Sequence, residues 1–393
     1  MKVIHICTCD YGGAGLCCLR INDALKKIGI DSKVLVLNKK SKRDDVFKYG
    51  YYKWFVWKII NKFFRFMRIN FTEYNRVLNL GKQLKTAWSF PISIVDVSSH
   101  YLVKQADVVH LHWIGNFVDI PSFFQKVNKP IVWTLHDEFL FCGIRQYADS
   151  QLEIPLEKKY YEIKYNSIKK ISNFGVVFLS NLMFAKFHNE KIIKDRKMTI
   201  INNSVDYSMF KPVNKKESRR MLGIDNNCIV FVFVAASIND QRKGFDLLCE
   251  TLDRMNIPNA VIVAVGNNNE EVTRKNVISL GPIYSTQQLS VVYSCADYFV
   301  MPSQKEAFAQ TPLEAMACGL PAIVFPVSGT EELVNINNGV VCDDYTSESL
   351  ERGIETAMHR NYSSEYIRQN IIDRFSPEVM AEKYVKFYNQ ILI

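Results

Sequence analysis

Two glutamates in the segment 302–321, PSQKEAFAQTPLEAMACGLP, have the side chains and the spacing for chemistry. Glu306 precedes a predicted helix, and Glu314 lies in the first turn of that helix. A carboxylate only accepts hydrogen bonds, so it can bind two neighbouring hydroxyls at once. We expect Thr311 to be the N-cap, with Pro312 as the first helical residue. The amides that precede Thr311 could then hold an anion such as a diphosphate.

The same residues allow a structural interpretation of Glu314. The sequence from Thr311 to Glu314 is also a capping box, in which the glutamate only bonds back to the amide of the N-cap residue. On this segment alone, a binding role and a capping role for Glu314 have equal weight.

Arg242 and Lys243 form a second candidate group. They lie at the start of a predicted helix, where the helix dipole disfavours positive charge. This position indicates a nearby anion. An exposed basic pair with no ligand is the alternative interpretation.

Three histidines invite a metal-site interpretation. His110 and His112 alternate onto one face of a predicted strand, and His136 ends the next one, so the three could ligate zinc. A catalytic zinc site usually adds a clear carboxylate or third-ligand motif, and a histidine at a strand end is more often structural. We therefore expect no metal at this place.

The elements that must position these residues follow a βα alternation. The chain begins with a β-rich run, a turn at Gly12 and Gly13, and a helix-compatible stretch. Apolar runs then alternate with polar or helical stretches in both halves of the chain, on either side of a polar stretch at 202–217. Such alternation predicts parallel sheets with helices on both faces, and ligands bind beyond the carboxyl ends of their strands.

Length and composition favour two globular domains. The chain has 393 residues, of which 48% are hydrophobic and 23% are charged. We predict domains at 1–205 and 206–375 and a closing helix at 376–393. The sequence shows no apolar run of membrane-spanning length and no signal-peptide features, so we expect a cytoplasmic protein with reduced cysteines. Four clustered cysteines have neither CxxC nor zinc-finger spacing: Cys7, Cys9, Cys17 and Cys18.

The positive charge is concentrated near one segment. Ten Lys and Arg between residues 39 and 68, against Asp44 and Asp45, give +8 of the formal net charge of +9. Residues 51–71, YYKWFVWKIINKFFRFMRINF, interleave these cations with aromatic residues and predict a basic amphipathic helix. This helix could lie on an anionic membrane or pack on the domain as an ordinary surface helix. Nucleic acid is not an expected partner, because no motif that reads bases accompanies the patch.

The segment around the two glutamates resembles the signature of a known family. Glu306, seven intervening residues, Glu314 and the following AMACGLP are similar to the motif of the large family of retaining glycosyltransferases of GT-B fold, the glycosyl transferases group 1. The similarity extends to other segments, namely Gly12-Gly13, Thr134-Leu135-His136, Asn202-Asn203, Arg242-Lys243-Gly244-Phe245 and Leu280-Gly281-Pro282.

The resemblance implies two Rossmann-like domains that face each other across a cleft. The amino-terminal domain would bind the acceptor, the carboxy-terminal domain would bind a nucleotide sugar, and the last helix would cross back to the first domain. The implied catalytic residues are His136, Arg242, Lys243 and Glu306. The implied donor-binding residues are Gly12, Gly13, Ile283, Phe308, Ala309, Gln310 and Glu314.

The resemblance also implies a role for each group. Glu314 would bind the ribose hydroxyls of the donor, and Glu306 would bind sugar hydroxyls near the anomeric carbon. Lys243, supported by Arg242, would neutralise the departing nucleoside diphosphate, which makes a metal cofactor unnecessary. His136 would contact the donor sugar. The amides around residues 308–310 would hold the diphosphate.

Two features depart from the family pattern. Most members carry an arginine six residues before the lysine, where this chain has Ser237, which cannot supply the same charged contact to a phosphate. The usual glycines of the loop after Glu306 are replaced by Ala307 and Ala309, so its backbone must accommodate Cβ atoms.

The function implied is a glycosyltransferase of the hexosyltransferase type, acting in the synthesis of a cell-surface polysaccharide such as lipopolysaccharide or capsule. It would move a sugar from a nucleoside diphosphate sugar to a glycan or lipid-linked acceptor. The alternatives are a nucleotide-sugar epimerase of the same fold and a non-catalytic scaffold that binds sugar nucleotides. An anionic membrane surface would be a further partner through residues 51–71, with the protein on the inner face of the membrane.

Overall fold

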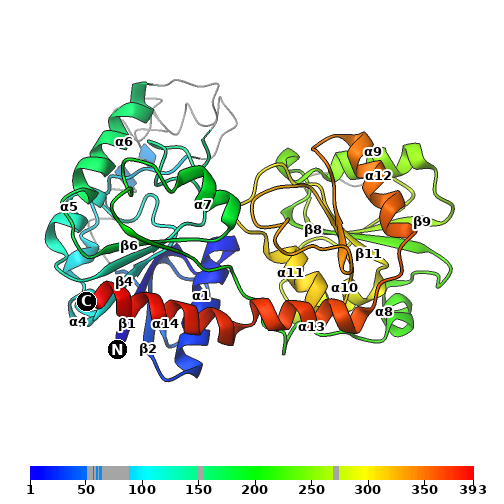
Figure 1. Ribbon diagram of the computed structural model, residues 1–393, viewed down its shortest axis with the longest axis horizontal. Coiled ribbons are helices and arrows are strands. Elements are labelled where there is room, and N and C mark those ends of the chain that lie inside the picture. The colour runs from blue at the N-terminus through cyan, green and yellow to red at the C-terminus, as the bar shows by residue number, and fades with distance from the viewer. Residues whose placement is uncertain (51–55, 57–58, 61, 64–87, 149–154, 269–273) are drawn as a thin grey trace. The chain divides into compact units, whose positions relative to one another are not determined.

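The structure is a computed structural model in which the chain divides into two compact units (Figure 1). The first unit contains residues 1–179, 184–201 and 381–393, and the second contains residues 180–183 and 202–380. The residues described are 1–50, 56, 59–60, 62–63, 88–148, 155–268 and 274–393. The predicted basic amphipathic helix at 51–71 thus lies largely outside the described residues.

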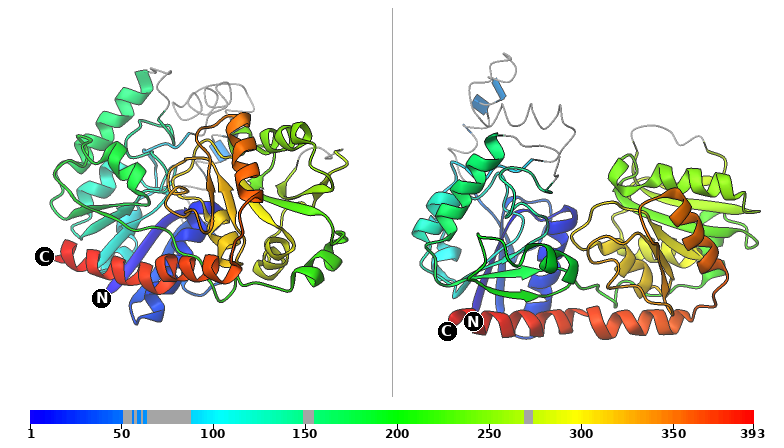
Figure 2. Two further views of the ribbon diagram at one scale, coloured as in Figure 1. Left: turned by 45° about the vertical axis from the view of Figure 1, so that its right-hand side comes forward. Right: turned by 45° about the horizontal axis from the view of Figure 1, so that its top comes forward.

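The first unit is built on a seven-stranded parallel sheet with the strand order β3-β2-β1-β4-β5-β6-β7. Its strands are β1 (Lys2–Cys9), β2 (Asp31–Asn38), β3 (Val46–Lys48), β4 (Val108–Leu111), β5 (Ile131–Thr134), β6 (Phe174–Phe178) and β7 (Lys197–Ile200). Strands β4, β5 and β6 are buried at every position, which is typical of parallel strands covered on both faces. Figure 2 shows helices on both sides of this sheet.

The helices of the first unit include the last helix of the chain. In chain order they are α1 (Gly12–Lys27), η1 (Val97–Ser99), α4 (Tyr101–Gln105), α5 (Ile120–Lys126), α6 (Pro155–Ile168), α7 (Asn181–Phe187), whose first residues belong to the second unit, and α14 (Pro377–Leu392), most of which belongs to the first. A Cβ atom on Gly175 of β6 would lie 2.5 Å from Cδ1 of Ile391. Glycine at this position therefore lets α14 pack against the sheet. The two chain ends lie close together (Figures 1 and 2).

The second unit repeats this plan with a six-stranded parallel sheet of order β10-β9-β8-β11-β12-β13. Its strands are β8 (Ile229–Ser237), β9 (Ala260–Asn267), β10 (Val277–Ser279), β11 (Tyr298–Met301), β12 (Ala322–Val324) and β13 (Gly339–Val341). Its helices are α8 (Lys215–Leu222), η2 (Gln241–Lys243), α9 (Phe245–Met255), α10 (Thr286–Cys295), α11 (Gln310–Ala317), α12 (Ser347–Met358) and α13 (Ser364–Phe375). Two parallel, helix-flanked sheets confirm the predicted α/β class.

Short polar residues and glycines set the helix ends. Asn214 begins α8, because its side-chain oxygen accepts a hydrogen bond from the amide of Glu217 at 3.0 Å. Gly223 ends the same helix in the left-handed region, with φ 68°. In the part of the chain that the structure describes, no helix combines the length and the apolar content needed to cross a membrane.

The predicted site residues follow the carboxyl ends of the strands in each unit. In the first unit, Gly12 and Gly13 come after β1, and His136 comes after β5. In the second unit, the basic pair follows β8 and the loop of Glu306 follows β11. Because the strands of each sheet are parallel, these loops share one edge of their own sheet.

Gly244 determines how closely the turn after β8 approaches β11. It has φ +76°, and a Cβ atom there would lie 2.3 Å from the carbonyl oxygen of Pro302. The amide of Gln304 donates to the carbonyl oxygen of Arg242 at 2.9 Å, which joins the two loops. Only glycine allows both the backbone angle and this contact.

We predict that Gly244→Ala destabilises the second unit by roughly 3 kcal/mol or more, because a backbone clash adds to the left-handed strain. Gly223→Ala is the matched control, since Gly223 shares the positive φ but has open space around the added Cβ. This control should cost about 1 kcal/mol. Urea unfolding followed by circular dichroism measures both values, and equal losses would show that the contact with Pro302 is unimportant.

Candidate active site

Lys243 and Glu306 form an ion pair in the second unit. Nζ of Lys243 lies 2.5 Å from Oε1 of Glu306, and the side chains are 27% and 12% exposed. Lys243 ends η2 directly before Gly244, and Glu306 lies in the loop between β11 and α11. The two loops that Gly244 brings together thus deliver one positive and one negative group to the same place.

Arg242 is held by a different carboxylate. Its Nε and Nη2 atoms donate to the two oxygens of Asp240 at 3.1 and 2.7 Å. Asp240 also caps η2, because it accepts from the amide of Arg242 at 3.1 Å. Arg242, which was predicted to support Lys243, is therefore bonded to Asp240, a carboxylate that was not among the predicted site residues.

The start of α11 differs from the prediction. The helix begins at Gln310 with Ala309 as the N-cap residue, so Thr311 is not the N-cap and Pro312 is not the first helical residue. Pro312 is still in the first turn, where its missing N–H removes no intrahelical hydrogen bond. The hydroxyl of Thr311 points to Sδ of Met301, at 3.9 Å.

This earlier start excludes the alternative in which Glu314 closes a capping box with Thr311. Glu314 is 7% exposed and accepts a hydrogen bond from the hydroxyl of Tyr293 of α10 at 3.2 Å. The carboxylate is thus oriented from a neighbouring helix.

The loop before α11 is packed in place despite its alanines. Ala307, Phe308 and Ala309 are each less than 10% exposed. Ala309 has φ −70° and ψ 138°, an extended conformation that any residue adopts. The carbonyl of Phe308 accepts from Nδ2 of Asn203 at 3.4 Å, and a Cβ on Gly329 would lie 2.5 Å from the Phe308 ring. The amides of residues 309–311 are at the amino-terminal end of α11, where backbone N–H groups have no acceptor within the helix.

Two other predicted positions of the second unit make different contacts. Ser237, which stands where the family has an arginine, donates to the backbone carbonyl of Asn267 at 3.3 Å. Ile283 is half-buried between β10 and α10, two residues after Gly281, which has φ +69°.

In the first unit, Gly12 and Gly13 belong to α1 itself. Gly12 has φ +73°. Both residues have open space where a Cβ would be. The glycine that packs closely is Gly15, where a Cβ would lie 2.6 Å from the carbonyl oxygen of Cys9. The turn therefore leaves room beside Gly12 and Gly13.

His136 belongs to a cluster of histidines at the same sheet. Its Nε2 lies 3.0 Å from Nδ1 of His112, whose Nε2 lies 2.8 Å from Nδ1 of His5. His110 lies beside His112, with ring centroids 4.2 Å apart. Burial lowers the pKa of His5 to about 3 and that of His136 to about 4. It also lowers the pKa values of His110 and His112 well below the usual value.

The closest possible metal ligands in the described part of the first unit are His5, His110 and His112, rather than the set with His136. Every ring nitrogen of these three already has a protein hydrogen-bond partner. A metal would have to break these bonds.

His5 was missed from the sequence. Strand β1 pairs with β4 so that His5 lies opposite His110, and only this register brings it to the cluster. The continuous apolar run around His5 could have placed it in a buried strand, but not beside its partner.

Comparisons with known proteins identify similar sequences and similar folds. The model of the family Glycosyl transferases group 1 matches residues 214–374. The chain is 25% identical over 308 residues to the alpha-galactosylglucosyldiacylglycerol synthase of Streptococcus pneumoniae, which covers 73% of this chain and 78% of that protein.

Two solved structures show the same fold over nearly the whole chain. Sucrose-phosphate synthase from Thermosynechococcus elongatus has a TM-score of 0.69 at 16% identity, covering 100% of this chain and 99% of that chain. Anabaena Alr3699/HepE, solved in complex with UDP and glucose, has a TM-score of 0.65 at 16% identity, covering 99% of each chain. Residues 214–374 are therefore similar to the glycosyl transferases group 1, and the chain is a glycosyltransferase of GT-B fold.

Proposed function

We propose that the protein transfers a sugar from a nucleoside diphosphate sugar to a glycan or lipid-linked acceptor, with retention at the anomeric carbon. The observation that carries the proposal is the Lys243–Glu306 ion pair in the loops that lead to α9 and α11. It supplies a cation for a phosphate and an acceptor for sugar hydroxyls in one place.

The leaving group is stabilised by fixed positive charge. As the glycosidic bond breaks, negative charge grows on the nucleoside diphosphate, and a positioned cation lowers the energy of that state. An ammonium group has three N–H donors, so Lys243 can bind a phosphate oxygen while it keeps Glu306 as a partner. The amides at the start of α11 add donors at the positive end of the helix. No metal ion is needed for this step.

The two carboxylates recognise the rest of the donor. Glu306 accepts hydrogen bonds from hydroxyls of the transferred sugar, and Glu314 accepts them from the ribose. The Tyr293 hydroxyl donates to Glu314 at 3.2 Å and so helps to fix the orientation of this carboxylate before a ligand binds. In the first unit, His136 contacts the donor sugar, and Gly12 and Gly13 leave room for it.

The relatives support these classes of substrate. Anabaena Alr3699/HepE was solved with UDP and glucose, which are a nucleoside diphosphate and a sugar. The Streptococcus pneumoniae relative is named for a lipid product, a galactosylglucosyldiacylglycerol. Retention, the hexose and the role in cell-surface polysaccharide synthesis follow from the family resemblance of the Glu306–Glu314 segment.

We further propose that the protein works in the cytoplasm, at the inner face of the membrane. The basic aromatic segment 51–71 has the composition that binds anionic lipid, with cations for the phosphates and aromatics for the boundary. Among its described residues, Ile59, Ile60 and Phe63 are exposed.

Nucleotide sugars should stabilise the protein against heat. A donor at 100 times its dissociation constant adds about 2.7 kcal/mol to the free energy of unfolding. Thermal melting with a panel of UDP, GDP and ADP sugars measures this effect and identifies the donor. If none of these compounds raises the melting temperature, the protein is not a sugar-nucleotide enzyme.

With the donor found in that way, Lys243→Ala should lower kcat/KM for transfer by about 10² to 10³, because one charge on the leaving group is lost. Lys243→Arg should retain more activity, since it keeps the charge. Lys215→Ala is the matched control, because Lys215 forms an ion pair of the same 2.5 Å length with Asp297 in the same unit.

Initial rates of nucleoside diphosphate release with and without acceptor give the values. Equal activity of Lys243→Ala and Lys215→Ala would contradict the leaving-group role. Release of an altered nucleotide sugar without acceptor would identify an epimerase, and binding without turnover would identify a scaffold.

Binding to vesicles tests the membrane proposal. The protein should co-sediment with phosphatidylserine vesicles but not with phosphatidylcholine vesicles, and the bound fraction should fall as salt is raised. A protein in which Lys58, Lys62, Arg65 and Arg68 are changed to Gln should no longer bind. Equal binding to both lipids would remove the electrostatic explanation.

A further inference from the structure

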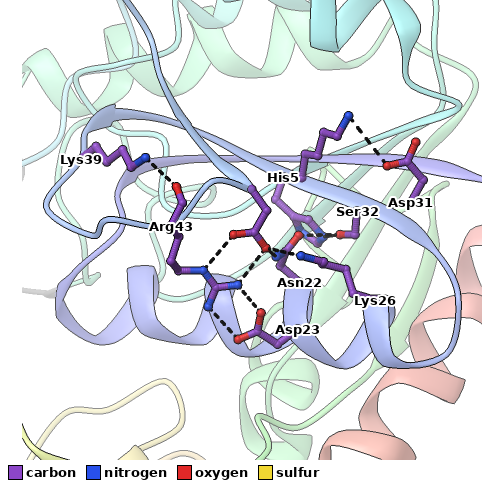
Figure 3. A network of polar contacts seen from close by, with 10 residues as sticks. His5, Asn22, Asp23, Lys26, Asp31, Ser32, Lys39 and Arg43 are labelled. Carbon is purple, nitrogen blue, oxygen red and sulfur yellow. Dashed lines mark hydrogen bonds and ion pairs between the residues drawn. The ribbon is translucent and has the colours of Figure 1, made fainter.

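A series of hydrogen bonds runs through the first unit from a surface carboxylate to His136. Nδ2 of Asn22 donates to Oδ2 of Asp45 at 2.8 Å, and Oγ of Ser32 donates to Oδ1 of Asn22 at 2.8 Å. Nε2 of His5 lies 3.0 Å from Oγ of Ser32. Figure 3 shows the labelled side chains of Asn22, Ser32 and His5 pointing toward one another from α1, β2 and β1.

The series continues through two imidazole contacts. Nδ1 of His5 lies 2.8 Å from Nε2 of His112, and Nδ1 of His112 lies 3.0 Å from Nε2 of His136. Asn22, Ser32, His5 and His112 are each at most 3% exposed. Water therefore does not compete for these hydrogen bonds.

The direction of the series is fixed at its outer end. Arg43 donates to both oxygens of Asp45, and Lys26 donates to one of them at 2.8 Å. The hydrogen bonds from Arg43 hold the pKa of Asp45 well below its usual range, so this group is a carboxylate and only accepts. Asn22 must therefore turn its NH₂ group toward Asp45 and its oxygen toward Ser32.

The donor and acceptor roles of each following group in the series are then determined. The single proton of the Ser32 hydroxyl goes to Asn22, so Ser32 must accept from Nε2–H of His5. A neutral imidazole has one N–H, so Nδ1 of His5 must accept from Nε2–H of His112. By the same rule, Nδ1 of His112 must accept from Nε2–H of His136.

The protonation state of both ring nitrogens of His136 is then determined. Burial lowers the pKa values of these imidazoles, which keeps them neutral near pH 7. His136 carries its hydrogen on Nε2, and its Nδ1 is a lone-pair acceptor. Within the described residues, Nδ1 of His136 receives no hydrogen bond. This atom can accept one from a hydroxyl.

We propose that Asn22, Ser32, His5 and His112 are positioning residues that hold His136 in the Nε2–H tautomer, so that its Nδ1 accepts a hydroxyl of the donor sugar. The hydrogen bond to the sugar hydroxyl rests on the proposed function, whereas the tautomer of His136 is a property of the free protein. The opposite tautomer would present an N–H, and the sugar hydroxyl would then have to accept the hydrogen bond instead of donating it.

His110 provides an internal control. Its Nε2 lies 2.7 Å from Oγ1 of Thr134 and its Nδ1 lies 2.7 Å from the hydroxyl of Tyr388, so it forms a separate branch beside the series. Tyr388→Phe removes a buried hydroxyl that contacts a histidine of the cluster but leaves the series from Asn22 to His136 unchanged.

The tautomers are measured by long-range ¹H–¹⁵N correlation spectra of the free protein labelled with [¹⁵N]histidine. The chain has seven histidines, and the spectrum of His136→Gln assigns the signal of His136 by its loss. We expect a protonated Nε2 and a bare Nδ1 for His136 in the wild type and in Tyr388→Phe.

Two variants should reverse the pattern at His136. Ser32→Ala removes the acceptor of His5, so His5 becomes the Nδ1–H tautomer, and His112 and His136 follow. Asn22→Leu releases the Ser32 hydroxyl, which can then donate to His5, with the same result. The bare and protonated signals of His136 should exchange in both, and two independent variants guard against a folding defect in one.

A wild-type His136 with Nδ1–H, or a signal that neither variant changes, would overturn the series while leaving the transfer reaction itself untouched. For the second half of the proposal, Ser32→Ala should raise KM for the donor roughly three- to tenfold, the value of one hydrogen bond, whereas Tyr388→Phe should not. A reversed tautomer with an unchanged KM would overturn the role of Nδ1 of His136 as the acceptor of a sugar hydroxyl.

Discussion

The ion pair between Lys243 and Glu306 is the contact on which the chemistry of the second unit depends. Each member comes from a different loop, and the positive φ of Gly244 and its contact with Pro302 let these loops meet. Because the pair is formed in the free protein, the cation and the acceptor need little rearrangement when a donor binds. Preorganised charge of this kind is worth more than charge that must be collected during the reaction.

In each unit the predicted site residues follow the carboxyl ends of the strands of its own sheet, but their chemistry differs between the two units. The second unit gathers a cation, two carboxylates and the end of a helix, which suits an anion and the hydroxyls attached to it. The first unit buries neutral histidines. A hydrogen-bond network that begins at Asp45 determines which ring nitrogen of each histidine in the series donates and which accepts. The parallel sheet supplies the position in both cases, and the side chains that follow the strands supply the chemistry.

Much of the fold was predictable from the sequence, because buried parallel strands are short apolar runs and their helices are amphipathic. Strands β3, β10 and β13 are hard to predict, because each has three residues and lies at an edge of its sheet, where so short a run carries little pattern. Thr311 was wrongly predicted as an N-cap, because the packed loop of Phe308 starts the helix two residues earlier, at Gln310. His5 could not be linked to His110 and His112 before the register of β1 and β4 was known. The roles of the predicted site residues stay predictions until a ligand is bound.

A crystal structure of the protein with the stabilising nucleoside diphosphate sugar tests the central claim most directly. We expect a phosphate oxygen within hydrogen-bond distance of Nζ of Lys243, sugar hydroxyls on Glu306 and ribose hydroxyls on Glu314. A donor bound with its diphosphate away from Lys243, and with Lys243 and Glu306 still bonded only to each other, would contradict it.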